Sequence, residues 1–122
     1  MQSALPVTGA FLAVAFADGR YDPLEEKRFL STIANHPALA VIRTEALQEA
    51  YNLLRAEIET DYPAACAKIL SSIAATKDDA AVSEAVKVAA RGAVVADRRV
   101  APQEEAMLDR IAGALGLEAG TV

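Results

Sequence analysis

The feature of this chain that most limits its possible folds is an acidic turn that occurs twice. In both copies Ala-Asp is followed, after a gap of four residues, by Pro-x-Glu-Glu, at residues 17–26 and 96–105. The two aspartates, Asp18 and Asp97, are 79 positions apart. An apolar segment precedes each copy and an amphipathic segment follows it. The sequence therefore predicts two pseudo-equivalent helix-turn-helix halves.

The composition indicates that both halves belong to one helical domain. A chain of 122 residues has the size of a single domain, here residues 1–122, and can bury a substantial core. Hydrophobic residues make up 53% of it and aromatic residues only 5%. Alanine dominates the hydrophobic residues and is the best helix former, whereas strands favour β-branched and aromatic side chains. We therefore expect an all-α fold, a compact bundle of six to seven helices.

Periodicity and end signals divide the chain into helical segments. Leu47, Tyr51, Leu54 and Ile58 recur at the spacing of one helix face, for example. Asp22-Pro23 is a strong helix start, and Asn35-His36-Pro37 ends that helix. A connector at 38–42 adds at most one turn. The expected helices span residues 6–17, 23–34, 44–59, 63–75, 80–96 and 102–115. The segments 6–17 and 80–96 are the most apolar, so we expect them to pack together centrally and to bring the acidic turns close.

The acidic turns contain the candidate site residues. An Asp at the end of one helix and a Glu in the first turn of the next are seven residues apart in each copy, Asp18 with Glu25 and Asp97 with Glu104. Asp22 adds a carboxylate to the first copy only. Carboxylate oxygens are the preferred ligands of hard divalent cations. If the turns are neighbours, these side chains predict a site for Ca²⁺, Mg²⁺ or Mn²⁺.

A second interpretation of the same residues needs no metal. A Glu in the first turn of a helix stabilises it through the helix dipole, and an Asp can hold a turn by bonds to the backbone. In the second copy, Arg98 and Arg99 provide cations that could neutralise the carboxylates. Under this interpretation the chain is a purely structural protein–protein interaction domain. Both interpretations remain open at the level of sequence.

Other classes of function find little support in the sequence. The net charge of −5, without a basic stretch, argues against nucleic-acid binding. The longest apolar run, residues 5–17, is too short to cross a bilayer. His36 stands at a helix end, and Cys66 falls on an apolar face where a buried, inert thiol is the usual case. No acid, base and nucleophile set can be assembled, so we expect no enzymatic activity.

The doubled turn in an Ala-rich helical chain resembles the TerB-like domain of tellurite-resistance proteins. Related domains occur at the N-terminus of some DnaJ-type membrane co-chaperones. The resemblance rests on Ala17-Asp18-Gly19, Pro23 and Glu25, on Ala96-Asp97, Pro102 and Glu104, and on Leu115-Gly116-Leu117.

This resemblance implies an all-α domain of about seven helices in a cytoplasmic bacterial protein. It also implies an adaptor that binds a protein partner and takes part in tellurite or other stress responses. A metal would be held by clustered acidic residues, which here are Asp18, Asp22, Glu25, Asp97 and Glu104. The second turn departs from the pattern of the first at Arg98 and Ala101.

Overall fold

The computed structural model describes residues 4–17, 27, 44–97 and 102–118, and within them it contains helices and no strand. These helices are α1 (Ala4–Ala15), α3 (Thr44–Thr60), α4 (Tyr62–Ala75), α5 (Ala80–Asp97) and α6 (Pro102–Ala114). The expected all-α class is confirmed. Apart from residue 27, the helix expected at residues 23–34 lies outside the described residues, and so do residues 18–26 of the first acidic turn. The count of six to seven helices and the repeated architecture therefore remain predictions.

The observed helix bounds agree closely with the sequence signals, and the largest difference is at α1. This helix begins at Ala4, two residues before the expected start, and it contains Pro6 in its first turn. A proline is tolerated there because the first four N–H groups of a helix have no partner within the helix. The helix ends at Ala15, and the following turn is closed by the N–H of Ala17, which donates to the Val14 carbonyl over 3.1 Å.

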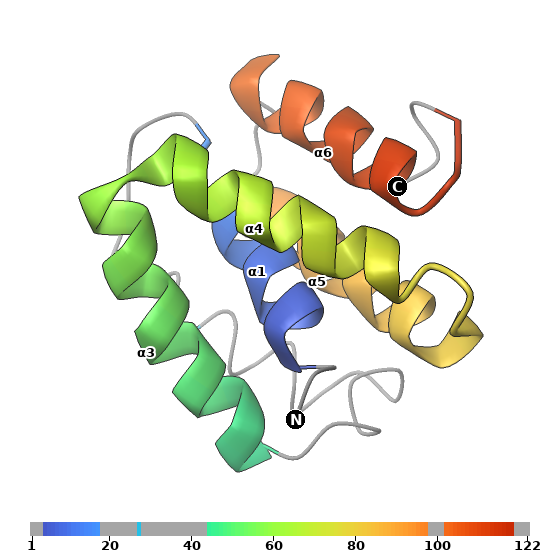
Figure 1. Cartoon of the computed structure of the whole chain (residues 1–122). Coiled ribbons are helices and arrows are strands. Elements are labelled where there is room, and N and C mark those ends of the chain that lie inside the picture. Colours follow the sequence, from blue (N-terminus) through green and yellow to red (C-terminus); the bar gives the residue numbers. More distant parts are fainter. Residues whose placement is uncertain (1–3, 18–26, 28–43, 98–101, 119–122) are drawn as a thin grey trace.

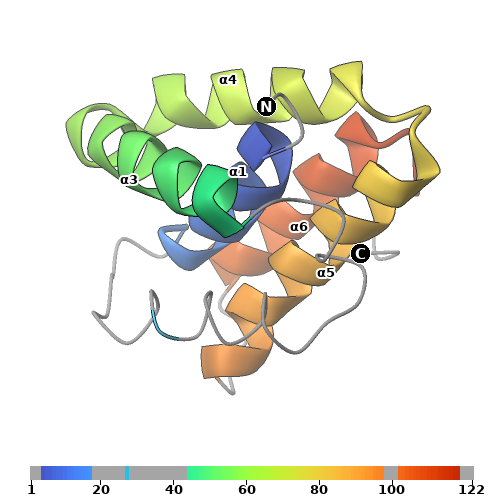
Figure 2. The same ribbon diagram turned by 90° about the horizontal axis from the view of Figure 1, so that it is seen from below.

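Helix α1 is the centre of the fold. Every residue of α1 except Leu5 is buried. Its largest interface is with α5, which confirms the expected pairing of the two most apolar segments. It also contacts α3, α4 and α6. Figures 1 and 2 show these helices arranged around α1, with α4 lying across the outside of the bundle.

The surrounding helices present one apolar face each to this centre. On α3 the predicted stripe is buried along its whole length, from Leu47 to Ile58. The corresponding buried face of α4 is formed by Cys66, Ile69 and Ile73. On α5 and α6 the buried hydrophobic residues are Val82, Ala85, Val86, Ala89, Ala90, Ala93, Met107, Ile111 and Ala112, and Leu115, directly after α6, is buried as well. Leu70 and Leu108 pack against this core but are only partly buried.

Local signals determine where these helices begin and end. The carboxylate of Asp61 accepts a hydrogen bond from the Ala64 N–H at 3.2 Å and caps α4. Asp79 caps α5 in the same way, accepting from the Ala81 and Val82 N–H groups at 3.1 and 3.2 Å. Gly116 ends α6 with a φ of +76°, in the left-handed region that glycine adopts without strain. The sequence predicted this end of α6.

Candidate functional site

Of the residues predicted to form a metal site, Glu104 is the one whose side chain the structure describes. It lies in the first turn of α6, two residues after Pro102. Its exposed fraction is 2%, whereas the adjacent Glu105 is exposed. Glu104 shares its helix face with Met107 and Ile111, three and seven residues further on, and both of these are buried. The carboxylate therefore belongs to the interior of the bundle and not to its surface.

The burial of Glu104 distinguishes it from an ordinary helix-capping residue. A carboxylate in the first turn interacts favourably with the helix dipole while it remains in water, and that interaction is worth about 0.3–1 kcal/mol. Burying an ionised carboxylate without compensation costs far more than this. Glu105 could serve as the solvated acid of the turn, so the dipole alone does not account for the inward position of Glu104.

The remaining predicted ligands are neither brought together nor separated by the described structure. Asp18, Asp22 and Glu25 lie outside the described residues. Asp97 is the last residue of α5, and its backbone is described but its side chain is not. Within the described part of the chain, no group of three or more His, Cys, Asp or Glu residues is placed to hold a metal ion. The convergence of the two acidic turns stays a prediction.

The C-terminal end of α1, which leads into the first acidic turn, is fixed by a contact from α4. The hydroxyl of Tyr62 donates a 2.6 Å hydrogen bond to the backbone carbonyl of Ala13. This carbonyl is in the last turn of α1, where carbonyls lack partners within the helix. The contact joins residues 49 positions apart and holds the end of α1 against the start of α4. Asp18 follows this end in the chain after two further residues, Phe16 and Ala17.

Cys66 is also on the inner face of α4, one turn after Tyr62. Burial raises the pKa of its thiol from the ordinary value of 9.0, and the neighbouring Tyr62 side chain and the Arg110 guanidinium counteract part of this effect. The exposed fraction of Cys66 is 1%, as the apolar face predicted. A protonated and buried thiol is a poor nucleophile and a poor metal ligand.

A hollow at the corner between α3 and α4 is a feature that the sequence interpretation missed. It has a volume of about 460 Å³, and alanines from both helices line it, namely Ala56, Ala64 and Ala65. Lys68 on α4 and Glu57 on α3 also line the hollow and form an ion pair of 3.0 Å. The signal that could have revealed it is the group of small residues on both sides of Asp61, where α3 ends and α4 begins.

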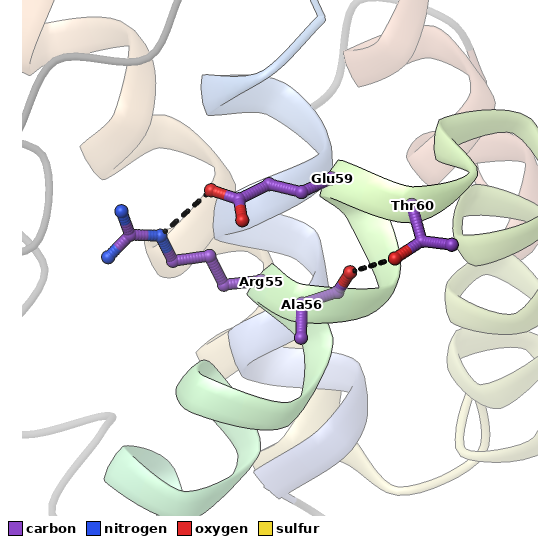
Figure 3. A network of polar contacts seen from close by, with 4 residues as sticks. All are labelled: Arg55, Ala56, Glu59 and Thr60. Atoms are coloured by element: carbon purple, nitrogen blue, oxygen red, sulfur yellow. Dashed lines mark hydrogen bonds and ion pairs between the residues drawn. The ribbon is translucent and has the colours of Figure 1, made fainter.

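Near this hollow, polar side chains of α3 form hydrogen bonds and ion pairs with other residues of the same helix. Thr60 donates its hydroxyl proton to the Ala56 carbonyl over 2.9 Å, and Arg55 pairs with Glu59 at 3.3 Å. Figure 3 shows the Arg55–Glu59 pair on the opposite side of α3 from Thr60. The side of α3 that faces the hollow is therefore formed by Ala56, Glu57 and Thr60. The Arg55–Glu59 pair does not border the hollow.

Comparison with known proteins places the chain in a family. No curated protein and no solved structure matches it. No helix in the described residues combines the length and the apolar character that a membrane span requires. The family model described as tellurite resistance protein TerB matches residues 4–122, nearly the whole chain. The predicted resemblance is thereby confirmed, and the chain belongs to the TerB family of tellurite resistance proteins.

Proposed function

We propose that this TerB-family chain is a non-enzymatic interaction module that binds a divalent cation at its acidic turns. The ligands would come from Asp18, Asp22, Glu25, Asp97 and Glu104, and the cation would be Ca²⁺, Mg²⁺ or Mn²⁺. The observation that carries this proposal is the burial of Glu104, whose exposed fraction is 2%. Carboxylate oxygens are the ligands that hard divalent cations prefer, and the inward position of Glu104 gives the acidic turn before α6 a carboxylate turned away from bulk water.

The second function to be tested is a purely structural interaction domain without a metal. Its support comes from Asp61 and Asp79, which cap α4 and α5 through backbone N–H groups in the described structure. Acidic residues at helix starts in this chain therefore do serve as caps. Under this alternative Glu104 is a structural residue of the α6 start, and the acidic turns need no ion.

The non-enzymatic part of the proposal is supported by the state of Cys66. This residue is the only cysteine of the chain and therefore the strongest intrinsic nucleophile available. It is buried, and its pKa is raised by that burial. These properties favour a packing role over a catalytic one.

The experiment that separates the two functions is a thermal melt after EDTA treatment, repeated with CaCl₂, MgCl₂ or MnCl₂. A cation present at 100 times its Kd should add about 2.7 kcal/mol to the free energy of unfolding. Glu104→Gln keeps the shape of the side chain and removes its charge, so we expect it to abolish this increment. Glu105→Gln, in the same turn but exposed, is the matched control and should retain the increment.

Variants of the first acidic turn, at residues 17–26, make the test independent of how well Glu104→Gln folds. Asp18→Asn and Glu25→Gln should each weaken the cation effect, because both side chains belong to the proposed ligand set. A wild-type melt that no cation changes would reject the metal site. A cation effect that persists unchanged in Glu104→Gln, Asp18→Asn and Glu25→Gln would place the ion elsewhere and contradict the proposed ligands.

A further inference from the structure

The hollow between α3 and α4 is separate in the sequence from the acidic turns. Figures 1 and 2 show α3 and α4 meeting at a corner on the outside of the bundle. The hollow exists because the residues that face each other across this corner are alanines, Ala56 on α3 with Ala64 and Ala65 on α4. Its volume of about 460 Å³ falls in the range of roughly 300–1,000 Å³ typical of ligand pockets. Large apolar side chains of a partner would fit into such a space.

The apolar character of this groove continues along α3 by one further turn. Leu53 lies three residues before Ala56 and four before Glu57, on the same helix face. Its exposed fraction is 57%. Among the described residues, the other exposed large hydrophobic side chain is Leu117, at 40%. A groove of alanines bordered by an exposed leucine offers an apolar strip that a helix could cover.

The charges around the groove indicate the kind of partner. The face of α3 that bears Leu53 also carries Glu45, Glu49 and Glu57 at intervals of four residues, and Asp61 follows the helix. Against these four acidic residues, the one basic residue that lines the hollow is Lys68. The Lys68–Glu57 pair at the groove is substantially exposed, so it is weak and opens readily.

We propose that this groove, lined by Ala56, Ala64 and Ala65 and continued by Leu53, binds an amphipathic helix with an apolar face and basic flanks. The proposal rests on the interaction-module part of the proposed function and supplies the chemistry of the partner. Apolar side chains of the helix fill the hollow, and its lysines or arginines lie against the carboxylates of α3 and Asp61. A second copy of this chain is disfavoured as the occupant, because two chains of charge −5 repel each other.

The test uses a synthetic amphipathic peptide as the probe. The peptide is about 15 residues long, enough for a helix to form on binding, and has leucines at i, i+3, i+4 and i+7 with lysines at both flanks. A second peptide carries glutamates in place of the lysines. Affinity is measured by fluorescence anisotropy in EDTA, which keeps the result independent of any cation. We expect the basic peptide to bind and the acidic peptide to bind at least tenfold more weakly.

The variant Ala64→Phe fills the groove from an exposed position and should weaken binding of the basic peptide at least tenfold. The matched control is Ala74→Phe, at an alanine of α4 that is also exposed and lies about 15 Å further along the helix. This variant should bind the peptide as the wild type does. Raising NaCl from about 0.05 M to about 0.5 M should weaken binding of the basic peptide, because the charges are exposed and become screened.

Four outcomes would overturn the proposal. The basic peptide could fail to bind, it could bind Ala64→Phe as tightly as wild type, or the acidic peptide could bind equally well. A dimer in sedimentation velocity that Ala64→Phe dissociates would also overturn it, because the groove would then belong to a second copy. None of these results affects the cation-dependent melt, so failure of the groove and failure of the metal site are distinguishable.

Discussion

At the scale of single residues, Gly9 of α1 lies so close to the side chain of Ile69 on α4 that no larger residue fits at this position without a shift. A Cβ atom added to Gly9 would lie 2.7 Å from both Cγ1 and Cγ2 of Ile69. Real Cβ atoms do not approach other heavy atoms so closely, so the two helices would have to move apart. The absence of a side chain at Gly9 is what allows α4 to pack directly on α1.

We predict that Gly9→Ala destabilises the protein by about 1–3 kcal/mol, the usual cost of overpacking, even though alanine is the better helix former. The matched control is Gly113→Ala in α6, where an added Cβ meets nothing within 4 Å. That change should stabilise by about 0.5–1 kcal/mol. Urea unfolding of both variants checks the pair. Equal effects of the two substitutions would show that the contact with Ile69 does not constrain the fold.

The second residue-scale prediction concerns pH and Cys66. Burial raises the pKa of this thiol, so the folded state retains the proton over a pH range in which the unfolded chain has lost it. The stability that this difference provides is fully present below the ordinary pKa of the thiol in the unfolded chain, 9.0. It decreases as the pH rises above that value and through the folded pKa.

Cys66→Ala removes the titrating group, so the difference in unfolding free energy between wild type and this variant should shrink from pH 8 to pH 10. Unfolding in urea at a series of pH values measures it. A difference that stays constant over this range would mean that the pKa of Cys66 is the same in the folded and unfolded chains.

At the scale of elements, the structure links the end of one helix to the start of another that is distant in the sequence. Tyr62 and Ala13 are 49 positions apart, and the hydroxyl of Tyr62 satisfies a carbonyl in the last turn of α1. The end of α1 therefore depends on α4 as well as on its own sequence.

We predict that Tyr62→Phe costs about 1–3 kcal/mol, because it leaves the carbonyl of Ala13 partly buried without this donor. Thr60→Val is the control: it removes a hydroxyl from an exposed bond within α3 and should change stability by less than about 0.5 kcal/mol. Hydrogen exchange should quicken at the amides of Phe16 and Ala17 in Tyr62→Phe. Unchanged exchange at these amides would contradict a role of Tyr62 at the end of α1.

The ends of the helices and their buried faces are the features of the fold that local sequence signals predicted. The start of α4 after Asp61, the end of α6 at Gly116 and the buried stripe of α3 all followed from residues within a few positions of one another. The candidate site did not follow in the same way. A capping pattern predicts Glu104 and Glu105 equally well as acids of a first turn, and only packing determines that Glu104 is buried. The groove was missed because it is made by two helices and belongs to neither.

At the scale of the whole molecule, α1 is the element that connects the other described helices. It is buried nearly all round and contacts α3, α4, α5 and α6. A substitution that destabilises α1 should therefore also destabilise the outer helices, because each of them loses part of its apolar interface when α1 unfolds.

We predict that Leu12→Ala, at a site with no solvent exposure, costs about 2–5 kcal/mol and lowers the protection of amides in α3 and α6 by the same free energy. Leu53→Ala is the same substitution at 57% exposure and should cost less than about 0.5 kcal/mol. Native-state hydrogen exchange provides the measurement. Loss of protection confined to α1 would show that the outer helices are stable without it.

The sequence by itself determined the helical class, the helix ends and the inward faces of the described helices. These features depend on backbone propensities and on hydrogen bonds between near neighbours, and the residues that govern them are close together in the chain. The tertiary structure decided the burial of Glu104, the bond from Tyr62 to Ala13 and the groove between α3 and α4. Each of these depends on which surfaces of separate helices meet, and burial and distance between remote segments arise only when those helices pack around α1.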